Sequence, residues 1–186
     1  GFGRIAIAYR TDKIYTIPCD MDTDMDYLFE KLSEVAERAG CFSMCGLKDA
    51  MSSITGIRKE NGFDVVVAAY LLNPLKSDYN YEDVAREQLG ILIDDKTNDA
   101  GKACYEAYTA YASVKPLWEK LRETGMERLF REIEMPLVFT LFDMEQAGVK
   151  VEAEALKIYG DQLGERIVEL EKEIYSLAGE QFNINS

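Results

Sequence analysis

Short runs of apolar residues near the N-terminus predict strands. RIAIAY (4–9) and KIYTIP, which starts at Lys13, are rich in β-branched and aromatic residues, and only residues 10–12 separate them. Such side chains favour extended backbone, and a short polar connection is typical of an antiparallel hairpin. CFSMC (41–45) is a third compact apolar run. The pattern therefore predicts a hairpin followed by a separate strand.

Helical patterns follow these runs. YLFEKLSEVAERAG is amphipathic and ends on Gly40, as a helix with a C-terminal glycine does. Asn80 is a suitable cap for the next amphipathic run, and Asp83 would lie in its first turn, where the helix dipole favours an acid. Further helices are expected over 47–54, 63–73 and about 98–122, the second of them apolar nearly all round and therefore buried. Strands followed by helices predict an α/β sheet domain over residues 1–118.

The remaining residues, 119–186, predict long helices. Residues 126–147 form an amphipathic pattern that Pro136 should kink or restart. After Gly148 a long helical pattern runs to Gly179. In it leucines recur every seven residues, with Gly160, Ile167 and Ile174 on the adjoining seam: Leu156, Leu163, Leu170 and Leu177. A heptad pattern over about three repeats keeps a coiled-coil interaction module open as an alternative function.

Composition narrows the classes of chemistry. The 186 residues include 34 acidic and 21 basic side chains, a formal net charge of −13, which opposes tight non-specific DNA binding by this chain alone. Histidine is absent, which excludes Ser-His-Asp and Cys-His nucleophiles and most zinc sites. We also expect no membrane contact, since no apolar run approaches the roughly 20 residues that span a bilayer.

The four cysteines, Cys19, Cys41, Cys45 and Cys104, form no CxxC pair. Cys41 and Cys45 fall in an apolar run, where we expect buried, reduced thiols rather than metal ligands. Reduced thiols predict a cytoplasmic location.

Two apparent motifs fail on spacing. Counted from Asp20 in DMDTDMD, a calcium-binding EF-hand loop needs glycine at its sixth position and glutamate at its twelfth, but Met25 and Lys31 stand there. Gly101-Lys102 lacks both the earlier glycine and the following Ser or Thr of a phosphate-binding loop. The acidic run is therefore expected to be a solvated helix N-terminus.

A tyrosine stripe marks the predicted helix over 98–122. Tyr105, Tyr108 and Tyr111 lie three residues apart, with Glu106 as the only carboxylate among them. Aromatic residues at helical spacing pack in cores more often than they stack on bases, and stacking platforms normally come with a basic track. We therefore expect these tyrosines to pack.

Several segments, in order, resemble bacterial DNA polymerase I of family A. They cover nearly the whole chain: FDVVVAAYLLNP (63–74), YEDVAREQLG (81–90), REIEMPLVFTLFDMEQAGVKV (131–151) and LAGEQFNINS (177–186). The IEMPL…AGVKV block and the closing FNINS are the most specific pieces. The resemblance implies an RNase H-like 3′–5′ exonuclease-type domain over 1–118, followed over 119–186 by long helices from the base of the polymerase thumb.

The resemblance also implies how the protein meets its partners. The aspartates of nucleotidyl transfer would lie beyond Ser186, so we do not expect this chain to polymerise DNA itself. It would reach DNA through the full-length polymerase of replication and repair, with the polymerase domain in cis and Mg²⁺ as the cofactor of that parent enzyme. For the fragment itself we expect no cofactor and a monomeric state.

The exonuclease positions are degenerate when the family's motifs are carried over. The family's exonuclease holds two metal ions with several acids. Its first motif, Asp-x-Glu, would precede the first strand of this chain. In the second motif, Leu-Lys-Tyr-Asp, Ala50 takes the place of the carboxylate, and Asp49 comes one residue early, about 100° away on a helix. In the third motif, Lys102 matches the tyrosine and Glu106 the aspartate.

These positions predict a proofreading domain that has lost its metal site and serves as a structural platform. No catalytic residue and no metal ligand are expected in the chain; Ala50, Lys102 and Glu106 mark the degenerate site. Lys102 would add a positive charge that opposes metal binding. A weakly active two-metal exonuclease, completed by an intact first motif, is a second alternative beside the coiled-coil module.

Overall fold

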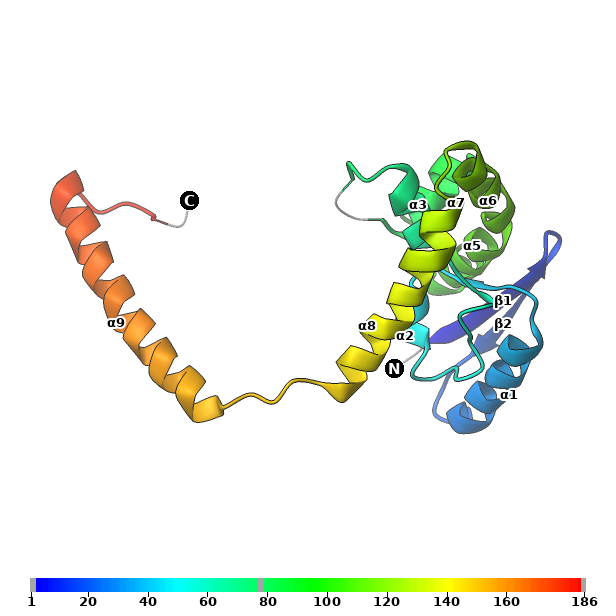
Figure 1. Ribbon diagram of the computed structural model, residues 1–186, viewed down its shortest axis with the longest axis horizontal. Helices are drawn as coiled ribbons and strands as arrows, with labels where there is room; N and C mark the ends of the chain where they lie inside the picture. Colours follow the sequence, from blue (N-terminus) through cyan, green and yellow to red (C-terminus); the bar gives the residue numbers. More distant parts are fainter. Residues whose placement is uncertain (1–2, 77–78, 185–186) are drawn as a thin grey trace. The chain divides into compact units, whose positions relative to one another are not determined.

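The computed structural model describes residues 3–76 and 79–184 (Figure 1). It is a mixed α/β structure rich in helices. Two compact units divide between Gln146 and Ala147. The predicted boundary after residue 118 falls inside a helix of the first unit, and the assignment of 119–186 to the opening of a polymerase domain stays a prediction. Of the closing FNINS segment, Asn185 and Ser186 lie outside the described residues.

The predicted hairpin is confirmed. Strands β1 (Arg4–Arg10) and β2 (Lys13–Pro18) pair antiparallel, with Ile5 opposite Ile17 and Ile7 opposite Tyr15. Near the turn the register shifts by one residue, which is a β-bulge. Ile5 and Ile7 pack against the hydrophobic core, so one face of the hairpin is anchored there.

The acidic run that follows starts a helix. α1 (Met25–Arg38) is capped by Asp24, whose carboxylate accepts a hydrogen bond from the Tyr27 N–H at 3.0 Å. This is the expected solvated helix N-terminus. Leu32 and Ala36 bury the inner face of the helix.

Strands β3 (Phe42–Met44) and β4 (Gly62–Asp64) form a parallel pair. The prediction of a helix over 63–73 was wrong at its start, because Phe63 and Asp64 pair with Ser43 and Met44 and the helix α3 (Val65–Leu72) begins only afterwards. The helix predicted over 47–54 shrinks to the single turn α2 (Leu47–Ala50). Pairing of distant segments decided the first of these boundaries.

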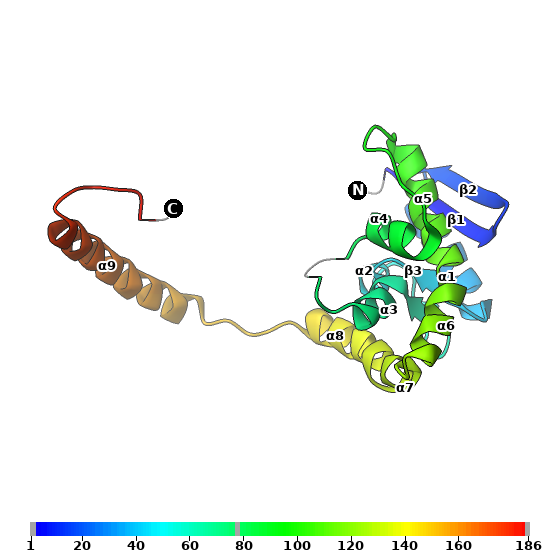
Figure 2. The same cartoon turned by 90° about the horizontal axis from the view of Figure 1, so that it is seen from above.

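The helix predicted over 98–122 is two helices. α5 (Asp99–Ala112) is capped by Asn98, and α6 (Val114–Glu123) begins after Ser113. Pro116 lies in the first turn of α6, where its missing N–H is tolerated. In the interior of one continuous helix the same proline would break the helix. α5 packs against β1, β2 and β3, so it connects the two strand pairs (Figure 2).

Pro136 restarts a helix, as expected. α7 (Glu127–Leu129) leads into a wide π-helical turn, η2 (Phe130–Glu134), and α8 (Met135–Ala147) follows. Proline lacks the N–H of an ordinary helical bond and crowds the preceding turn. The π-helical turn sits where that crowding falls, and a single wide turn inside a helix is the usual form of such a distortion.

An aromatic cluster ties these helices to the strands. The rings of Phe63, Trp118 and Phe130 lie 4.9 to 5.6 Å apart between centroids. Phe63 comes from β4, Trp118 from α6 and Phe130 from η2. The core of the first unit therefore spans the predicted boundary at residue 118.

The second unit contains one long helix, which follows a short connecting segment. α9 (Ala153–Ala178) ends at Gly179, whose φ of 76° is the left-handed conformation that favours glycine. No residue of α9 is buried. The heptad leucines, Leu156, Leu163, Leu170 and Leu177, are 39% to 82% exposed.

The cysteines are free thiols in the described residues. Cys41 is exposed, not buried as expected, because it lies in the connection between α1 and β3, ahead of the strand. Among residues 3–76 and 79–184, no helix combines the length and apolar character that a bilayer crossing requires.

Candidate functional site

The segment that carries Ala50 is held in place by a carboxylate that sequence reasoning missed. Asp64 ends β4, is 3% exposed, and accepts the N–H groups of Leu47 at 2.7 Å and Gly46 at 3.4 Å. Its Oδ1 also accepts from the N–H groups of Val66 and Val67 and so caps α3. Burial raises the pKa of Asp64, although these backbone donors favour its charged form. Asp64 therefore fixes α2 against α3.

Ala50 has no polar function in this arrangement. Its side chain is half-buried and packs against the hydrophobic core, while Asp49 is exposed. The two residues thus point in different directions, as their spacing on a helix requires. Lys48, on the same turn, forms an ion pair with Glu145 of α8. The turn that resembles the second motif is therefore bound to the core and to α8, and it presents no carboxylate at position 50.

Glu106 lies on α5 next to groups from two other segments, the end of β3 and the start of α4. It is exposed, yet desolvation raises the pKa of its carboxyl group, and the neighbouring carboxylate of Glu82 raises it further. Glu106 in turn contributes to raising the pKa of the Cys45 thiol, after the larger effect of burial. The carboxyl group of Glu106 and the thiol of Cys45 therefore both hold their protons more tightly than the free groups do.

Tyr81, the first residue of α4 (Tyr81–Val84), is the remaining member of the group of side chains around Glu106. Burial raises the pKa of Tyr81 to about 12; the adjacent Glu82 side chain contributes next, and the charge of Glu106 contributes less. Its hydroxyl is buried, and no hydrogen-bond partner of full geometry is found for it among the described residues. The phenol is therefore neutral at physiological pH. It contributes an apolar ring surface and a single polar atom to this group of side chains.

Lys102 lies one turn before Glu106 on α5, and it is exposed. It helps to line an open hollow of about 420 Å³ between α4, α5 and the connection that joins them. The other charged side chains of the hollow are Glu82, Asp83, Arg86, Asp94 and Asp95. The lysine therefore faces a mainly acidic surface, where its charge partly offsets the carboxylates.

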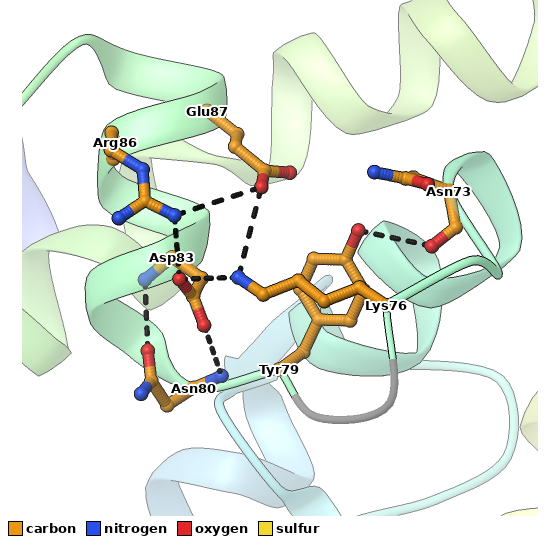
Figure 3. Close-up of polar contacts among 7 residues, drawn as sticks. All are labelled: Asn73, Lys76, Tyr79, Asn80, Asp83, Arg86 and Glu87. Carbon is orange, nitrogen blue, oxygen red and sulfur yellow. Dashed lines mark hydrogen bonds and ion pairs between the residues drawn. The ribbon is translucent and has the colours of Figure 1, made fainter.

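The position of α4 depends on a capping box at its start. The Asn80 side chain accepts the Asp83 N–H at 2.9 Å, and the Asp83 carboxylate accepts the Asn80 N–H at 3.4 Å (Figure 3). This reciprocal pair satisfies two N–H groups that a helix end leaves free. Asn80 was predicted as the cap, and the prediction is confirmed.

Asp83 also binds two cationic side chains. Figure 3 shows the ammonium group of Lys76 pointing to Asp83, with which it forms an ion pair. The same ammonium group lies 4.9 Å from the centroid of the Tyr79 ring. Arg86 binds the same carboxylate at 2.7 Å from the next turn, where α4 passes into the π-helical turn η1 (Ala85–Leu89). These contacts lower the pKa of Asp83, Lys76 being the main cause. The network fixes α4 and thereby the place of Tyr81 and Glu82.

The three predicted site positions thus lie in different surroundings. Glu106 is near Cys45, Tyr81 and Glu82, whereas Ala50 is packed into the core. Among residues 3–76 and 79–184, no three His, Cys, Asp or Glu side chains gather with metal-site geometry. The sequence signal for Asp64 was present, since an Asp before an apolar run is a typical helix cap, but its contact with Leu47 is not local.

Comparison with known proteins gives a consistent set of relatives. The chain is 29% identical to DNA polymerase I of Bacillus subtilis over an alignment of 193 positions, which covers 92% of this chain and 21% of that protein. It is 34% identical to DNA polymerase I of Geobacillus stearothermophilus, over 67% of this chain and 16% of the relative. The thermostable DNA polymerase I of Thermus aquaticus is 36% identical over 70% of this chain and 15% of its own length.

The chain therefore spans only about a fifth, or less, of the length of these relatives. No family model matches it. Among solved structures, a similar fold occurs in the POL domain of Pol1 from M. smegmatis, which was solved in complex with DNA primer-template and dNTP. The TM-score is 0.67 at 22% identity, over 94% of this chain and 30% of the other.

Proposed function

Because the chain is homologous to bacterial DNA polymerase I of family A over most of its length, we propose that it is the part of such a polymerase that comprises a 3′–5′ exonuclease-type domain and the start of the polymerase domain. In the full-length enzyme it would serve DNA replication and repair, and it would meet DNA there. The Mg²⁺ of nucleotidyl transfer would be bound outside this chain. A cytoplasmic location fits the free thiols of the described residues.

The fold we propose for the first unit is RNase H-like. Supporting this proposal, β1 pairs with β2 and β3 pairs with β4, and α5 packs against both β1 and β3. Within the described residues the second edge of β1 and that of β3 carry no paired strand. A strand with the Asp-x-Glu motif, placed between them, would join the two pairs into one sheet.

We further propose that the exonuclease-type domain has no proofreading activity. The observation that carries this proposal is the packing of the Ala50 methyl group against the core, at the position where the family's motif has a carboxylate. Two-metal catalysis needs several carboxylates around two cations about 4 Å apart. Glu106 remains, but the groups near it are a thiol, a phenol and Glu82, and Lys102 stands one helical turn away. The residues present do not fit a two-metal site.

The remaining role is that of a platform for the helices that follow. The ion pair between Lys48 and Glu145 joins α2 to α8. The cluster of Phe63, Trp118 and Phe130 joins β4 to α6 and η2. Contacts of this kind hold the helices in place and take no part in a reaction. They would thereby orient the start of the polymerase domain.

Degradation of a 5′-labelled single strand tests the proposal. The protein would be used in a long form that carries the residues preceding Gly1, with Mg²⁺ and then with Mn²⁺, beside an active family member. We expect no shortening of the strand. Shortening that Glu106→Ala abolishes would overturn the proposal and establish a weakly active exonuclease.

A second arm restores acids in the chain itself. Ala50→Asp combined with Glu106→Asp should remain inactive, because the upstream acidic pair would still be required to hold two cations. Lys102→Tyr restores the tyrosine of the third motif and serves as the matched variant. Clear activity of the double variant in the absence of the upstream pair would contradict the proposed loss of the site.

A further inference from the structure

The free end of the β1–β2 hairpin exposes two stacked tyrosines. Tyr9 and Tyr15 are 53% and 52% exposed, their ring centroids lie 5.8 Å apart, and the ring planes differ by 10°. Figures 1 and 2 both show the turn of the hairpin standing clear of the helices. One face of each ring is in contact with the other ring, and about half of each side chain remains accessible to a planar ligand.

The β-bulge gathers cations on the same face as these rings. Residues directly opposite each other on paired strands share a face. Ile7 pairs with Tyr15, and Tyr9 follows Ile7 by two residues, so both tyrosines share the face of Ile7, which packs against the core; Tyr9 lies nearer the turn than Ile7 and, like Tyr15, is about half exposed. Regular alternation would send Arg10 to the other side, but the register shift pairs Arg10 with Lys13, which shares the face of Tyr15.

The resulting cation–tyrosine patch consists of Tyr9, Arg10, Lys13 and Tyr15. It is positive within an acidic chain, because residues 3–18 contain three basic side chains and one acidic, a net charge of +2 against −13 for the whole. The one acid, Asp12, pairs with Arg10 at 2.9 Å, but both side chains are more than half exposed. An exposed ion pair is worth about 0–1 kcal/mol, so Arg10 can exchange Asp12 for another anion.

The acidic run 20–26 begins at the opposite end of β2. Six strand residues at about 3.3 Å each place it roughly 20 Å from the turn. This separation exceeds the Debye length of about 8–10 Å at physiological ionic strength. The patch is therefore screened from the nearest acidic cluster in the sequence.

We propose that the cation–tyrosine patch binds single-stranded nucleic acid. A base stacks on the exposed ring surface of Tyr9 or Tyr15, and backbone phosphates lie against Arg10 and Lys13. The combination of aromatic faces with a cationic track is the general basis of single-strand binding. An acidic peptide could use the cations but has no need of two parallel ring faces. The patch lies on other residues than Ala50, Lys102 and Glu106, and the inference does not rest on the proposed function.

Fluorescence anisotropy of a labelled oligothymidylate of about 10 nucleotides, titrated with the whole chain at low salt, tests the inference. We expect saturable binding that weakens as salt is raised. Changing Tyr9→Ala or Tyr15→Ala should weaken it about tenfold each, the size of one lost base stack. A strand of the same length without bases should bind more weakly than oligothymidylate. Absence of binding at low salt, or equal binding of both strands, would overturn the inference.

Matched variants separate stacking from folding. Tyr9→Phe and Tyr15→Phe keep the rings and should keep the affinity, and Tyr27→Ala removes a similarly exposed tyrosine from α1 and should change nothing. Arg10→Gln with Lys13→Gln should reduce the slope of log affinity against log salt by about 1.4, since each phosphate contact on a single strand contributes about 0.7. A loss as large in Tyr27→Ala, or an unchanged slope, would contradict the patch.

Discussion

Single residues matter most where one side chain serves several segments, and Asp64 does so for β4, α2 and α3. It is buried and accepts four backbone N–H groups. We expect Asp64→Ala to lower the free energy of unfolding by about 3 kcal/mol, roughly 1 for the lost cap and the rest for hydrogen bonds to a charged acceptor. Asp64→Asn should cost about half as much, because its amide oxygen can still cap α3.

Urea unfolding measures this effect. Asp49→Ala is the matched control, since Asp49 is an exposed acid on the turn that Asp64 holds, and a surface change of this kind should stay within about 0.5 kcal/mol. Equal effects of the two substitutions would show that Asp64 does not hold the β3–α2 connection.

Glu106 gives a prediction on pH. Its pKa is raised by desolvation and then by Glu82, so the folded protein binds this proton more tightly than the unfolded chain does. The protonated Glu106 side chain therefore contributes stability that is fully present below the unfolded pKa of about 4.3. This contribution is lost as pH rises through the higher folded pKa. Glu106→Gln should stabilise at pH 7, by roughly 0.5 kcal/mol because the side chain is solvent-exposed, and the gain should vanish near pH 4.

Unfolding of Glu106→Gln and wild type across this range of pH tests the sign. Glu60→Gln, an exposed acid between α2 and β4, serves as the control for removal of one negative charge from an acidic protein. A loss of stability in Glu106→Gln at pH 7 that disappears toward acid pH would mean that the fold stabilises Glu106 in its charged form, contrary to its surroundings.

At the scale of elements, local signals in the sequence found the helix ends and missed the pairings. Asn80, Asn98 and Gly179 mark helix boundaries where expected, because capping depends on a few neighbouring residues. The strand at Gly62–Asp64 was missed, since its partner β3 lies about 20 residues away and its own pattern continues into an apolar helix. The break at Ser113 was within reach of sequence reasoning, because Pro116 restricts the preceding turn.

The same limit applies to the candidate site. Ala50, Lys102 and Glu106 were found by motif position, whereas the neighbours of Glu106 come from β3's end and from α4. No spacing in the sequence relates Cys45 or Tyr81 to a residue on α5. Local chemistry could thus name the positions of the site but not the side chains that set their electrostatics.

α9 carries the prediction for oligomeric state. Its seam is exposed, yet Gly160 occupies one seam position and Gly164 follows one turn later. Each glycine inside a helix costs about 1 kcal/mol relative to alanine, and Gly160 offers no side chain to fill a partner's seam. We expect a monomer of 21.1 kDa whose mass by light scattering does not change with concentration. Gly160→Ile with Gly164→Ala should promote dimers; a wild-type mass that rises with concentration would instead favour the coiled-coil module.

At the scale of the whole molecule, buried residues define which part can fold by itself. Among the described residues, the buried members of the hydrophobic core lie between Leu32 and Phe139, inside the first unit. Removing residues 147–186 should therefore leave the free energy of unfolding within about 0.5 kcal/mol of the full chain. Urea unfolding followed by the fluorescence of Trp118, the single tryptophan, measures it, because its ring lies in the aromatic cluster with Phe63 and Phe130.

A chain ended at the predicted domain boundary, residue 118, is the informative counterpart. It loses five buried side chains of the core: Leu121, Phe130, Met135, Val138 and Phe139. At about 1.5–3 kcal/mol each, their loss removes roughly 10 kcal/mol, which is comparable to the whole stability of a domain. We expect the 1–118 form to be unfolded while the 1–146 form unfolds cooperatively. A cooperative transition of the 1–118 form would mean that the strands and α1–α5 make a sufficient core, and that the helices after Trp118 are additions to it.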